Sequence, residues 1–319
     1  MIRQLGLVFA GISISLTGIM CGGGGQQPDP DFDARVARPA FSSVHPVVLF
    51  DEGHRNLHSI ETTYRPFAEL LRSDGFTVAA TRTEFTASAL ERAAILVVVN
   101  PKGREHPYDS ALTDRECDAV ADWVRNGGNL LLVADHYPFG SSSENLSLRF
   151  GVAMSKGFVN DSLHCDSPTR SPVDGNSQLV FTRKDGLLVD CPLTNGRDSS
   201  ERVERVMTFT GQSLMGPPES VPFLKLAATA YDVVPDSVWD TSELIFFTNT
   251  HTRFGDPVSA AGKSQGIALT FGKGRVVILG EAAILTAQVA GKEKFGMQLA
   301  EIDNKRLVLN IMHWLSGTL

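Results

Sequence analysis

The stretch LTDRECDAVADWVRNGGNLLLVADH, residues 112–136, contains a helix, a stop signal and a buried strand in one unit. Thr113 followed three positions later by Glu116 is the pattern of a capping box, which marks the start of a helix. We expect this helix to span residues 113–125, because two glycines then end it. The next letters, NLLLV, are apolar without alternation, as in a strand that is covered on both faces. The stretch therefore predicts one α/β unit with its strand inside the core.

The same alternation of apolar runs and amphipathic helices extends outward from this unit. The runs at 47–50 and 93–101 predict two further buried strands, while 61–73 predicts a helix and 76–80 a strand between them. The order β, α, β, β, α, β predicts an open, mostly parallel, flavodoxin-like α/β sheet with helices on both faces. Near the C-terminus, TFGKGRVVIL predicts a hairpin that turns at residues 272–274, and NKRLVLNIMHWL predicts a final helix.

The region of about 155–240 breaks this pattern, because it is polar and rich in turn residues, with only short strand-like pieces. We interpret it as a loop- and β-rich insertion that decorates the sheet. No linker flanks the insertion in the sequence, so we expect residues 45–319 to form one α/β domain that includes it.

The first 44 residues have a different composition. Residues 5–20 are apolar and free of charge, which is too short for a comfortable transmembrane helix and fits a secretory signal. Cys21 and the flexible tether GGGGQQPDPDFD follow, an arrangement that resembles a bacterial lipoprotein, whose signal is removed and whose Cys is lipidated. We therefore expect a signal peptide over 1–21, a tether over 22–44, and an exported cell-envelope protein held at the membrane by a lipid on Cys21. An uncleaved anchor is the alternative.

Net charge and cysteine usage narrow the function classes. The formal net charge of −7 argues against nucleic acid as a partner, since proteins bind the phosphate backbone through a basic surface. Cys117 lies on the apolar side of the helix 113–125, so we expect a buried thiol. Cys165 and Cys191 both lie in the insertion, and in an oxidising envelope we expect a disulfide between them.

Titratable residues follow the apolar strand runs. In open α/β sheets ligands bind outside the carboxyl ends of the strands, so residues at those ends are candidates for a site. Asp135 could alternatively cap a helix expected at 142–150, although Ser141 and Ser142 are better placed for that role. The candidates are Asp51, Glu52 and His54, then Asn100, then Asp135 and His136, then His251, and finally Glu281.

Carboxylates and imidazoles at one edge indicate general acid–base work or metal binding. The catalytic set that we predict is Asp51, His54, Asp135, His136 and Glu281. Three of these, His54, Asp135 and His136, are also the predicted ligands of a possible divalent metal. Glu52 should point away from Asp51, since neighbours in an extended chain alternate. The sequence has no G-x-S-x-G elbow, no Cys at a strand-to-helix turn and no glycine-rich phosphate loop.

Four segments resemble a bacterial family of unknown function with a class I glutamine amidotransferase-like fold. They are VVLFDEGHRNLHS…YRPFAELLRSDGFTV, LTDRECDAVADWVRNGGNLLLVADHYPFG, GKGRVVILGEAAILTAQ and DNKRLVLNIMHWL. The resemblance covers about 45–151 and 265–317 and implies a flavodoxin-like sheet. True amidotransferases carry a nucleophilic Cys at the elbow after a central strand, where this chain reads Val133-Ala134-Asp135-His136. Hydrolysis of glutamine through a thioester is therefore not implied.

Two function classes remain open. The first is an envelope hydrolase that uses the Asp/His set, with or without a metal. The second is a non-enzymatic binding or assembly lipoprotein whose same cleft holds a small molecule, a sugar or a peptide by hydrogen bonds. The convergence of carboxylate and imidazole groups favours the first, and the missing nucleophile and metal motif favour the second.

Overall fold

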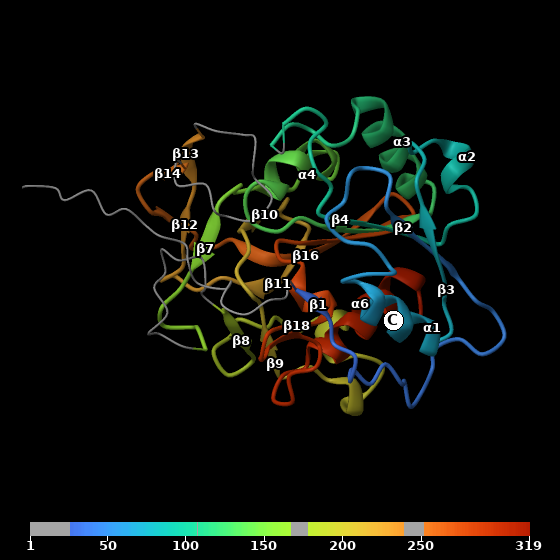
Figure 1. The fold of residues 1–319 in the computed structure, drawn as a ribbon. Helices are drawn as coiled ribbons and strands as arrows, with labels where there is room; N and C mark the ends of the chain where they lie inside the picture. The colour runs from blue at the N-terminus through green and yellow to red at the C-terminus, as the bar shows by residue number, and fades with distance from the viewer. Residues whose placement is uncertain (1–25, 107, 167–177, 239–251) are drawn as a thin grey trace, which may run out of the picture.

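A large mixed sheet forms the centre of the molecule (Figure 1). The computed structural model describes residues 26–106, 108–166, 178–238 and 252–319. Within these residues nine strands make up the sheet, in the order β3-β2-β4-β5-β17-β16-β10-β6, with β11 also paired to β16. The strands are β2 (Val47–Asp51), β3 (Thr77–Thr81), β4 (Ile95–Val99), β5 (Asn129–Val133), β6 (Ala153–Met154), β10 (Leu214–Met215), β11 (Val221–Lys225), β16 (Ser264–Phe271) and β17 (Gly274–Leu279).

Only one half of this sheet is parallel. Strands β3, β2, β4, β5 and β17 pair in parallel. Strand β16 turns back against β17 at the predicted hairpin, and β10, β6 and β11 add further antiparallel pairs. The prediction of a mostly parallel sheet is therefore too simple, and the structure shows a mixed α/β sheet. The hairpin of β16 and β17 is antiparallel because its turn is too short for a parallel crossover, and most of the other antiparallel strands come from the insertion.

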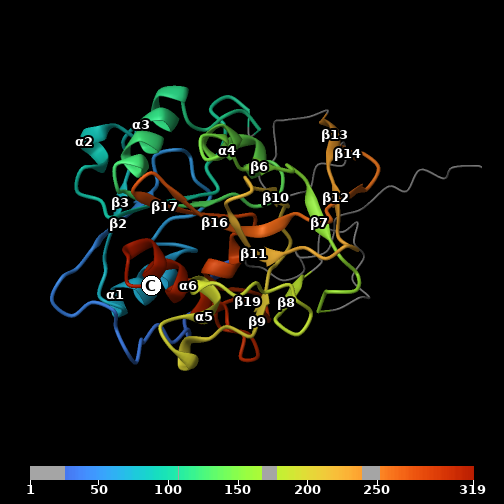
Figure 2. The same ribbon diagram turned by 180° about the vertical axis from the view of Figure 1, so that it is seen from behind.

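Helices cover both faces of the parallel half. Figure 2 shows α2, α3 and α4 on one side of the sheet and α1 and α6 on the other. Residues of β4 divide accordingly, because Ile95, Val97 and Val99 belong to the core of the α1 and α6 side and the alternate residues to the other core. All five residues of β4 are buried, as the unbroken apolar run predicts. The helices are α1 (Arg65–Ser73), α2 (Ala87–Leu90), α3 (Asp114–Arg125), α4 (Phe139–Leu148), α5 (Pro192–Asn195) and α6 (Asn304–Ser316).

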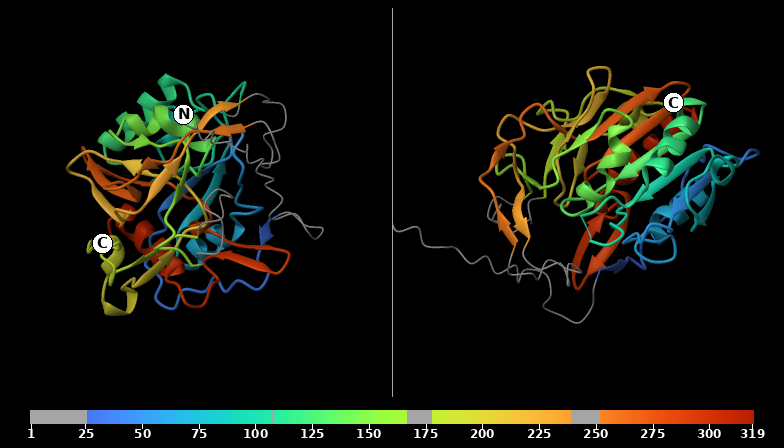
Figure 3. Two further views of the ribbon diagram at one scale, coloured as in Figure 1. Left: turned by 90° about the vertical axis from the view of Figure 1, so that its left-hand side faces the viewer. Right: turned by 90° about the horizontal axis from the view of Figure 1, so that it is seen from above.

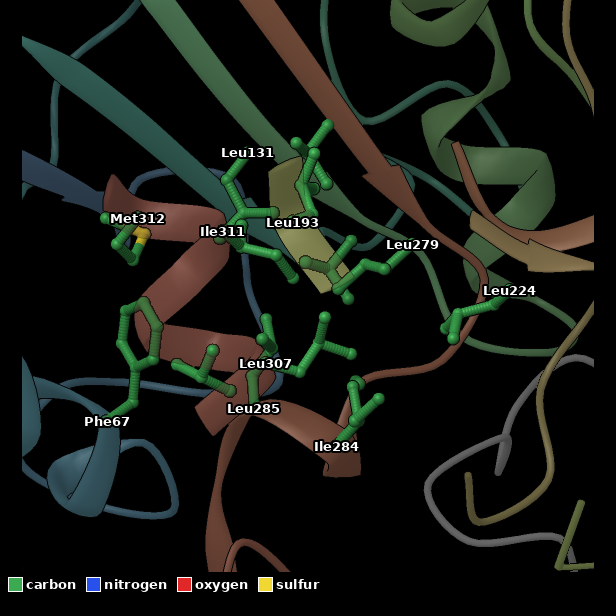
Figure 4. Packing of buried hydrophobic residues seen from close by; sticks show 14 of the residues in the cluster. Phe67, Leu131, Leu193, Leu224, Leu279, Ile284, Leu285, Leu307, Ile311 and Met312 are labelled. Carbon is green, nitrogen blue, oxygen red and sulfur yellow. The ribbon is translucent and has the colours of Figure 1, made fainter. Parts of the chain in front are cut away.

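The core between the sheet and α6 is a close packing of aliphatic side chains (Figure 4). Leu307 and Ile311 of α6 lie near Leu131 of β5 and Leu279 of β17. Burial of each such side chain contributes roughly 1.5–3 kcal/mol to stability. This packing fixes the sheet against α6 and so fixes the strand ends that carry the polar residues.

The insertion forms small sheets beside the antiparallel half. Figure 3 shows the β13–β14 hairpin at the end of the molecule that is far from α1. These sheets pair β15 with β12 and β7, β13 with β14, and β8 with β9. Their strands are β7 (Phe158–Asn160), β8 (Val180–Thr182), β9 (Arg205–Met207), β12 (Tyr231–Val233), β13 (Pro235–Val238), β14 (Thr252–Phe254) and β15 (Val258–Ser259), and two short 3-10 turns, η2 (Ser199–Glu201) and η3 (Ala283–Leu285), complete the elements.

The sequence patterns predicted the start of α3 correctly, whereas α1 and α4 begin at other residues than predicted. The capping box of Thr113 and Glu116 is present at the start of α3, as predicted. Helix α1 begins later than predicted, at Arg65, and Pro66 occupies its first turn, where its missing N–H costs nothing. Helix α4 begins earlier than predicted, after Pro138, and has no side-chain cap. Neither Asp135 nor the serines therefore cap it.

The cysteines are partly as expected. Cys117 is fully buried, and burial raises the pKa of its thiol to about 12. Cys191 is a free thiol at the start of α5, so the predicted disulfide with Cys165 is wrong. The Cys165 thiol instead lies 3.5 Å from the Ser162 carbonyl, within its own turn.

The described chain begins with a strand that adds to a hairpin. Strand β1 (Gln27–Pro28) pairs with β18 (Ala287–Ala290), which pairs with β19 (Glu293–Gly296). No described helix has the length and hydropathy needed to cross a membrane. Cys21 and His251 lie outside the described residues.

A substitution in the buried strand β5 should show how much the central packing contributes. Leu131→Ala leaves a cavity beneath α6, because Leu131 is 0% exposed. We expect a loss of roughly 2–5 kcal/mol in the free energy of unfolding, measured by chemical denaturation. The matched control is Leu148→Ala, at a position 50% exposed, which should change the free energy of unfolding by less than about 1 kcal/mol. Equal effects of the two substitutions would contradict this account of the core.

Candidate acid–base site at the carboxyl edge of the parallel strands

The register of β5 and β17 brings two carboxyl groups together. Val133 pairs with Leu279, and Asp135 and Glu281 each come two residues later. Neighbouring strands lie about 4.8 Å apart, so the two residues leave the sheet side by side. The charge of Asp135 contributes to a raised pKa at Glu281, as expected for close neighbours.

The environments of these two carboxyl groups differ. Glu281 is 1% exposed, and its two oxygens accept N–H groups of Ala283 and Ile284 at 2.6 and 2.8 Å. Asp135 has a side chain that is 17% exposed and accepts the backbone N–H of His136. Burial raises the pKa of both groups, and for Glu281 the charge of Asp135 raises it further. The pair therefore retains a proton more readily than an isolated carboxyl group, and the effect is larger at Glu281, the more deeply buried member.

A second polar chain approaches Asp135 from β4. The Asn100 Oδ1 accepts the backbone N–H of Asp135 at 2.9 Å. The Asn100 Nδ2 lies 3.2 Å from Nε2 of His58, whose Nδ1 lies 2.7 Å from the Thr63 hydroxyl. Burial lowers the pKa of His58 to about 3, with a further contribution from Lys102, so the ring is neutral and Nδ1 carries its hydrogen.

Tyr64 connects this chain with Glu281. Its ring contacts the His58 ring in a tilted arrangement with 4.8 Å between centroids, and its hydroxyl donates to the Ala282 carbonyl at 2.5 Å. Burial raises the pKa of the Tyr64 phenol, and the charges of Glu281 and Asp135 raise it further. The phenol is therefore a permanent hydrogen donor next to the carboxyl pair.

His136 is held beside Asp135 by its own turn. Its Nδ1 donates to the Tyr137 carbonyl at 2.8 Å, and its ring stacks on Phe158 at 4.6 Å. The remaining ring nitrogen, Nε2, lies 3.9 Å from Asp135 Oδ1. In the neutral ring Nε2 is thus the basic nitrogen.

Gln212 ties the two strand ends to the insertion. Its Nε2 donates to the carbonyls of Ala134 and Asp135, both at 2.9 Å, and its backbone N–H donates to Gly280. A Cβ on Gly140 would lie 2.3 Å from Gln212 Oε1, so a glycine is required at this approach. Through Gln212 the insertion therefore fixes the position of the backbone at Asp135.

Asp51 and His54 form a separate group with Glu116. His54 Nδ1 lies 2.8 Å from Asp51 Oδ1, and His54 Nε2 lies 2.9 Å from Glu116 Oε1. Burial alone would lower the pKa of His54, but the two carboxylates outweigh it and raise the pKa to about 9. Burial alone would raise the pKa of Glu116, but hydrogen bonds donated by Thr113 and His54 lower it to about 2. The ring is therefore a charged imidazolium that joins the end of β2 to the start of α3.

The hydrogen bonds thus divide the predicted catalytic set in two. Asp135, His136 and Glu281 lie at the ends of β5 and β17, whereas Asp51 and His54 lie at the end of β2 with Glu116. Glu52 turns away, as expected, and its two oxygens accept from Arg82 and from the Ile60 N–H.

The predicted metal ligands do not make one set. Across the described ranges, no group of three or more His, Cys, Asp or Glu side chains is placed to hold an ion. His54 has both ring nitrogens on carboxylates and carries a proton, which excludes it as a ligand in this arrangement. The three residues His54, Asp135 and His136 are also divided between the two groups, so we derive no step through a metal.

Sequence reasoning missed several members of these groups. Glu116 was interpreted only as part of a capping box, and nothing local indicates that its other oxygen reaches a ring 62 residues away. His58 precedes the first predicted helix, near which it is expected to cap or pack, yet it bonds to Asn100. For Tyr64 and Gln212 the sequence carries no signal that we can identify.

The raised pKa of His54 makes a prediction about stability. A folded pKa of about 9 against an ordinary value of 6.5 means that folding strengthens proton binding. The stabilisation is therefore complete below pH 6.5 and is lost as the pH rises through about 9. We expect the difference in unfolding free energy between the wild type and His54→Gln to shrink by about 3 kcal/mol over that interval, measured by denaturation at several pH values. The control is His106→Gln, at an exposed histidine. A difference that does not vary with pH would contradict the charged contact of His54 with Asp51 and Glu116.

Comparison with known proteins supports only a family and a fold. The N-terminal domain of mmIFT52 superposes with a TM-score of 0.56 at 12% identity, covering 85% of this chain and 97% of that domain. Two cytoplasmic proteins of Salmonella typhimurium also match. STM1381, from strain LT2, has a TM-score of 0.43 at 13% identity, covering 85% of this chain and 99% of that protein. STM3548 has a TM-score of 0.43 at 11% identity, covering 85% of this chain and 98% of that protein. No curated protein matches in sequence. The family model described as a domain of unknown function (DUF4350) matches residues 60–288, and the chain therefore belongs to this family.

Proposed function

We propose that this chain is an exported hydrolase of the cell envelope with an acid–base centre at Asp135, Glu281 and His136. The observation that carries the proposal is the buried carboxyl pair, in which Asp135 keeps a raised pKa and a partly exposed side chain. Perturbed carboxyl groups in close pairs are typical of catalytic acids. Substrates are expected among small molecules, sugars or peptides.

The fold part of the proposal is an amidotransferase-like, flavodoxin-like core. Numbering the parallel strands along the chain, their order in the sheet is 2-1-3-4-5, as in flavodoxin-like sheets. Asp135 occupies the turn after the fourth of them, β5, which corresponds to the elbow where true amidotransferases carry their nucleophilic Cys. An Asp at this turn supports proton transfer rather than a thioester.

The geometry assigns different tasks to the three residues. The carboxyl pair holds one proton, and Asp135, its partly exposed member, delivers that proton to the leaving group as the scissile bond breaks, while His136 Nε2 accepts a proton from the attacking water. Glu281 acts through Asp135, because two buried carboxyl groups this close do not both ionise readily and so share one proton. The proton then returns from His136 to Asp135 through solvent, which restores the resting state.

A binding function is the second candidate, and one observation favours it. Most polar atoms around the site already have internal partners, including both oxygens of Glu281 and both ring nitrogens of His58. A site of this kind can hold a sugar or peptide by hydrogen bonds to Asp135 and His136 without chemistry.

The variant Asp135→Asn separates the two candidates. It keeps the size and hydrogen-bonding shape of the side chain but cannot transfer a proton. We expect at least roughly a hundredfold loss of turnover on any chromogenic ester, glycoside or peptide that the wild type hydrolyses, with little change in binding. The matched control is Glu219→Gln at an exposed carboxylate.

A second measurement does not need a substrate. In ¹³C NMR titrations the pKa of the Asp135 carboxyl should fall in Glu281→Gln, because the neighbouring charge is gone. An unchanged Asp135 pKa, together with equal turnover of wild type and Asp135→Asn, would leave only the binding function.

Export and anchoring are tested separately. We propose that Cys21 carries the lipid, on the basis of the apolar run 5–20 and the tether that follows it. Cys21→Ser should move the protein from the membrane fraction to the soluble fraction in fractionated cells. Retention at the membrane would instead indicate an uncleaved anchor.

A further inference from the structure

A cavity lies beside the insertion, and its lining contains none of the acid–base residues. It is an open cavity of about 380 Å³ between the turn after β8, the end of β11 and the turn before β16. Leu187 and Leu226, which are buried core residues, form part of its wall together with Ala227. The volume is within the range of pockets that bind small molecules.

An oriented histidine lines this cavity. His164 Nδ1 lies 2.9 Å from Asp161 Oδ2, and the Asp161 side chain is only 3% exposed. Asp161 also accepts the Thr229 hydroxyl and the Leu163 N–H, so three donors fix its position. A carboxylate on Nδ1 holds the ring still and leaves Nε2 for a ligand.

Two opposite charges line the same cavity without pairing. The Lys225 ammonium and the Asp185 carboxylate both belong to the lining. Neither forms an ion pair with the other or with any other residue in the described parts of the chain. One Asp185 oxygen accepts the Thr182 hydroxyl at 2.5 Å, which fixes the carboxylate in place. The cavity therefore presents a cation and an anion more than 4 Å apart, together with apolar lining residues.

We propose that this cavity binds a small zwitterion, namely an amino acid or short peptide with an apolar side chain. The carboxylate of such a ligand pairs with Lys225, and its ammonium pairs with Asp185 and donates a hydrogen bond to His164 Nε2. Its side chain contacts Leu187, Leu226 and Ala227. A ligand with both charges pairs with Lys225 and Asp185 at once. A ligand with one charge pairs with only one of these residues and leaves the other without a partner.

The proposal does not depend on the hydrolase, because none of these residues belongs to the acid–base site. The test is calorimetric titration of the full chain with L-leucine and with L-alanyl-L-leucine as zwitterionic probes. N-acetyl-L-leucine and L-leucine methyl ester each lack one of the two charges and serve as matched probes. We expect saturable binding of the zwitterions and roughly tenfold weaker binding of each singly charged probe.

Substitutions in the lining complete the experiment. Lys225→Met and Asp185→Asn should each weaken binding of the zwitterion by roughly tenfold or more. Lys184→Met and Glu219→Gln are the controls, since both residues are exposed and lie outside the lining. Tighter binding of the dipeptide than of leucine identifies a peptide ligand, and the reverse identifies a free amino acid. The proposal is overturned if no probe binds at millimolar concentration, or if neither lining variant changes the affinity.

Discussion

The in-register pairing of three buried parallel strands is the constraint on which the rest of the structure depends. Val99 of β4 is paired with Val133 of β5, which is paired with Leu279 of β17. The polar residues that follow these three positions reach one edge because the register is shared. A slip of one residue would turn every side chain of a strand to the opposite face and would destroy both cores together. Apolar packing therefore specifies the position of the polar site.

Charge at this edge is tolerated because nearly every charged group has a partner. A buried ion without a partner costs several kcal/mol, whereas a fully bonded one is tolerated. The His54 imidazolium lies between two carboxylates, and Glu281 receives backbone N–H groups. Asp135 differs from them, since it combines burial, a like-charged neighbour and a partly exposed side chain. This difference distinguishes a group suited to chemistry from groups that hold the structure together.

The two halves of the molecule offer different kinds of site. The edge of the parallel half is closely packed, and its polar atoms are mostly bonded within the chain. The insertion carries an open cavity in which Lys225 and Asp185 remain unpaired with each other. Gln212 connects the halves, because it belongs to the insertion and bonds to the backbone at Ala134 and Asp135. The cavity and the acid–base site are therefore both attached to the same sheet, the cavity through the end of β11 and the site through the ends of β5 and β17.

The sequence by itself determined the elements whose signals are local. The capping box of Thr113, the unbroken run of β4 and the turn at residues 272–274 all appear where short-range patterns predict them. It also indicated that Asp135 and Glu281 each follow a strand at the same edge of the sheet. The tertiary structure alone decided which polar groups meet, as in the contacts of His54 with Glu116 and of His58 with Asn100. These pairs are 62 and 42 residues apart, and only the relative placement of helices and strands by core packing brings them together. The two-residue strands β6 and β10 likewise exist only because a neighbouring strand offers its edge, which no local pattern records.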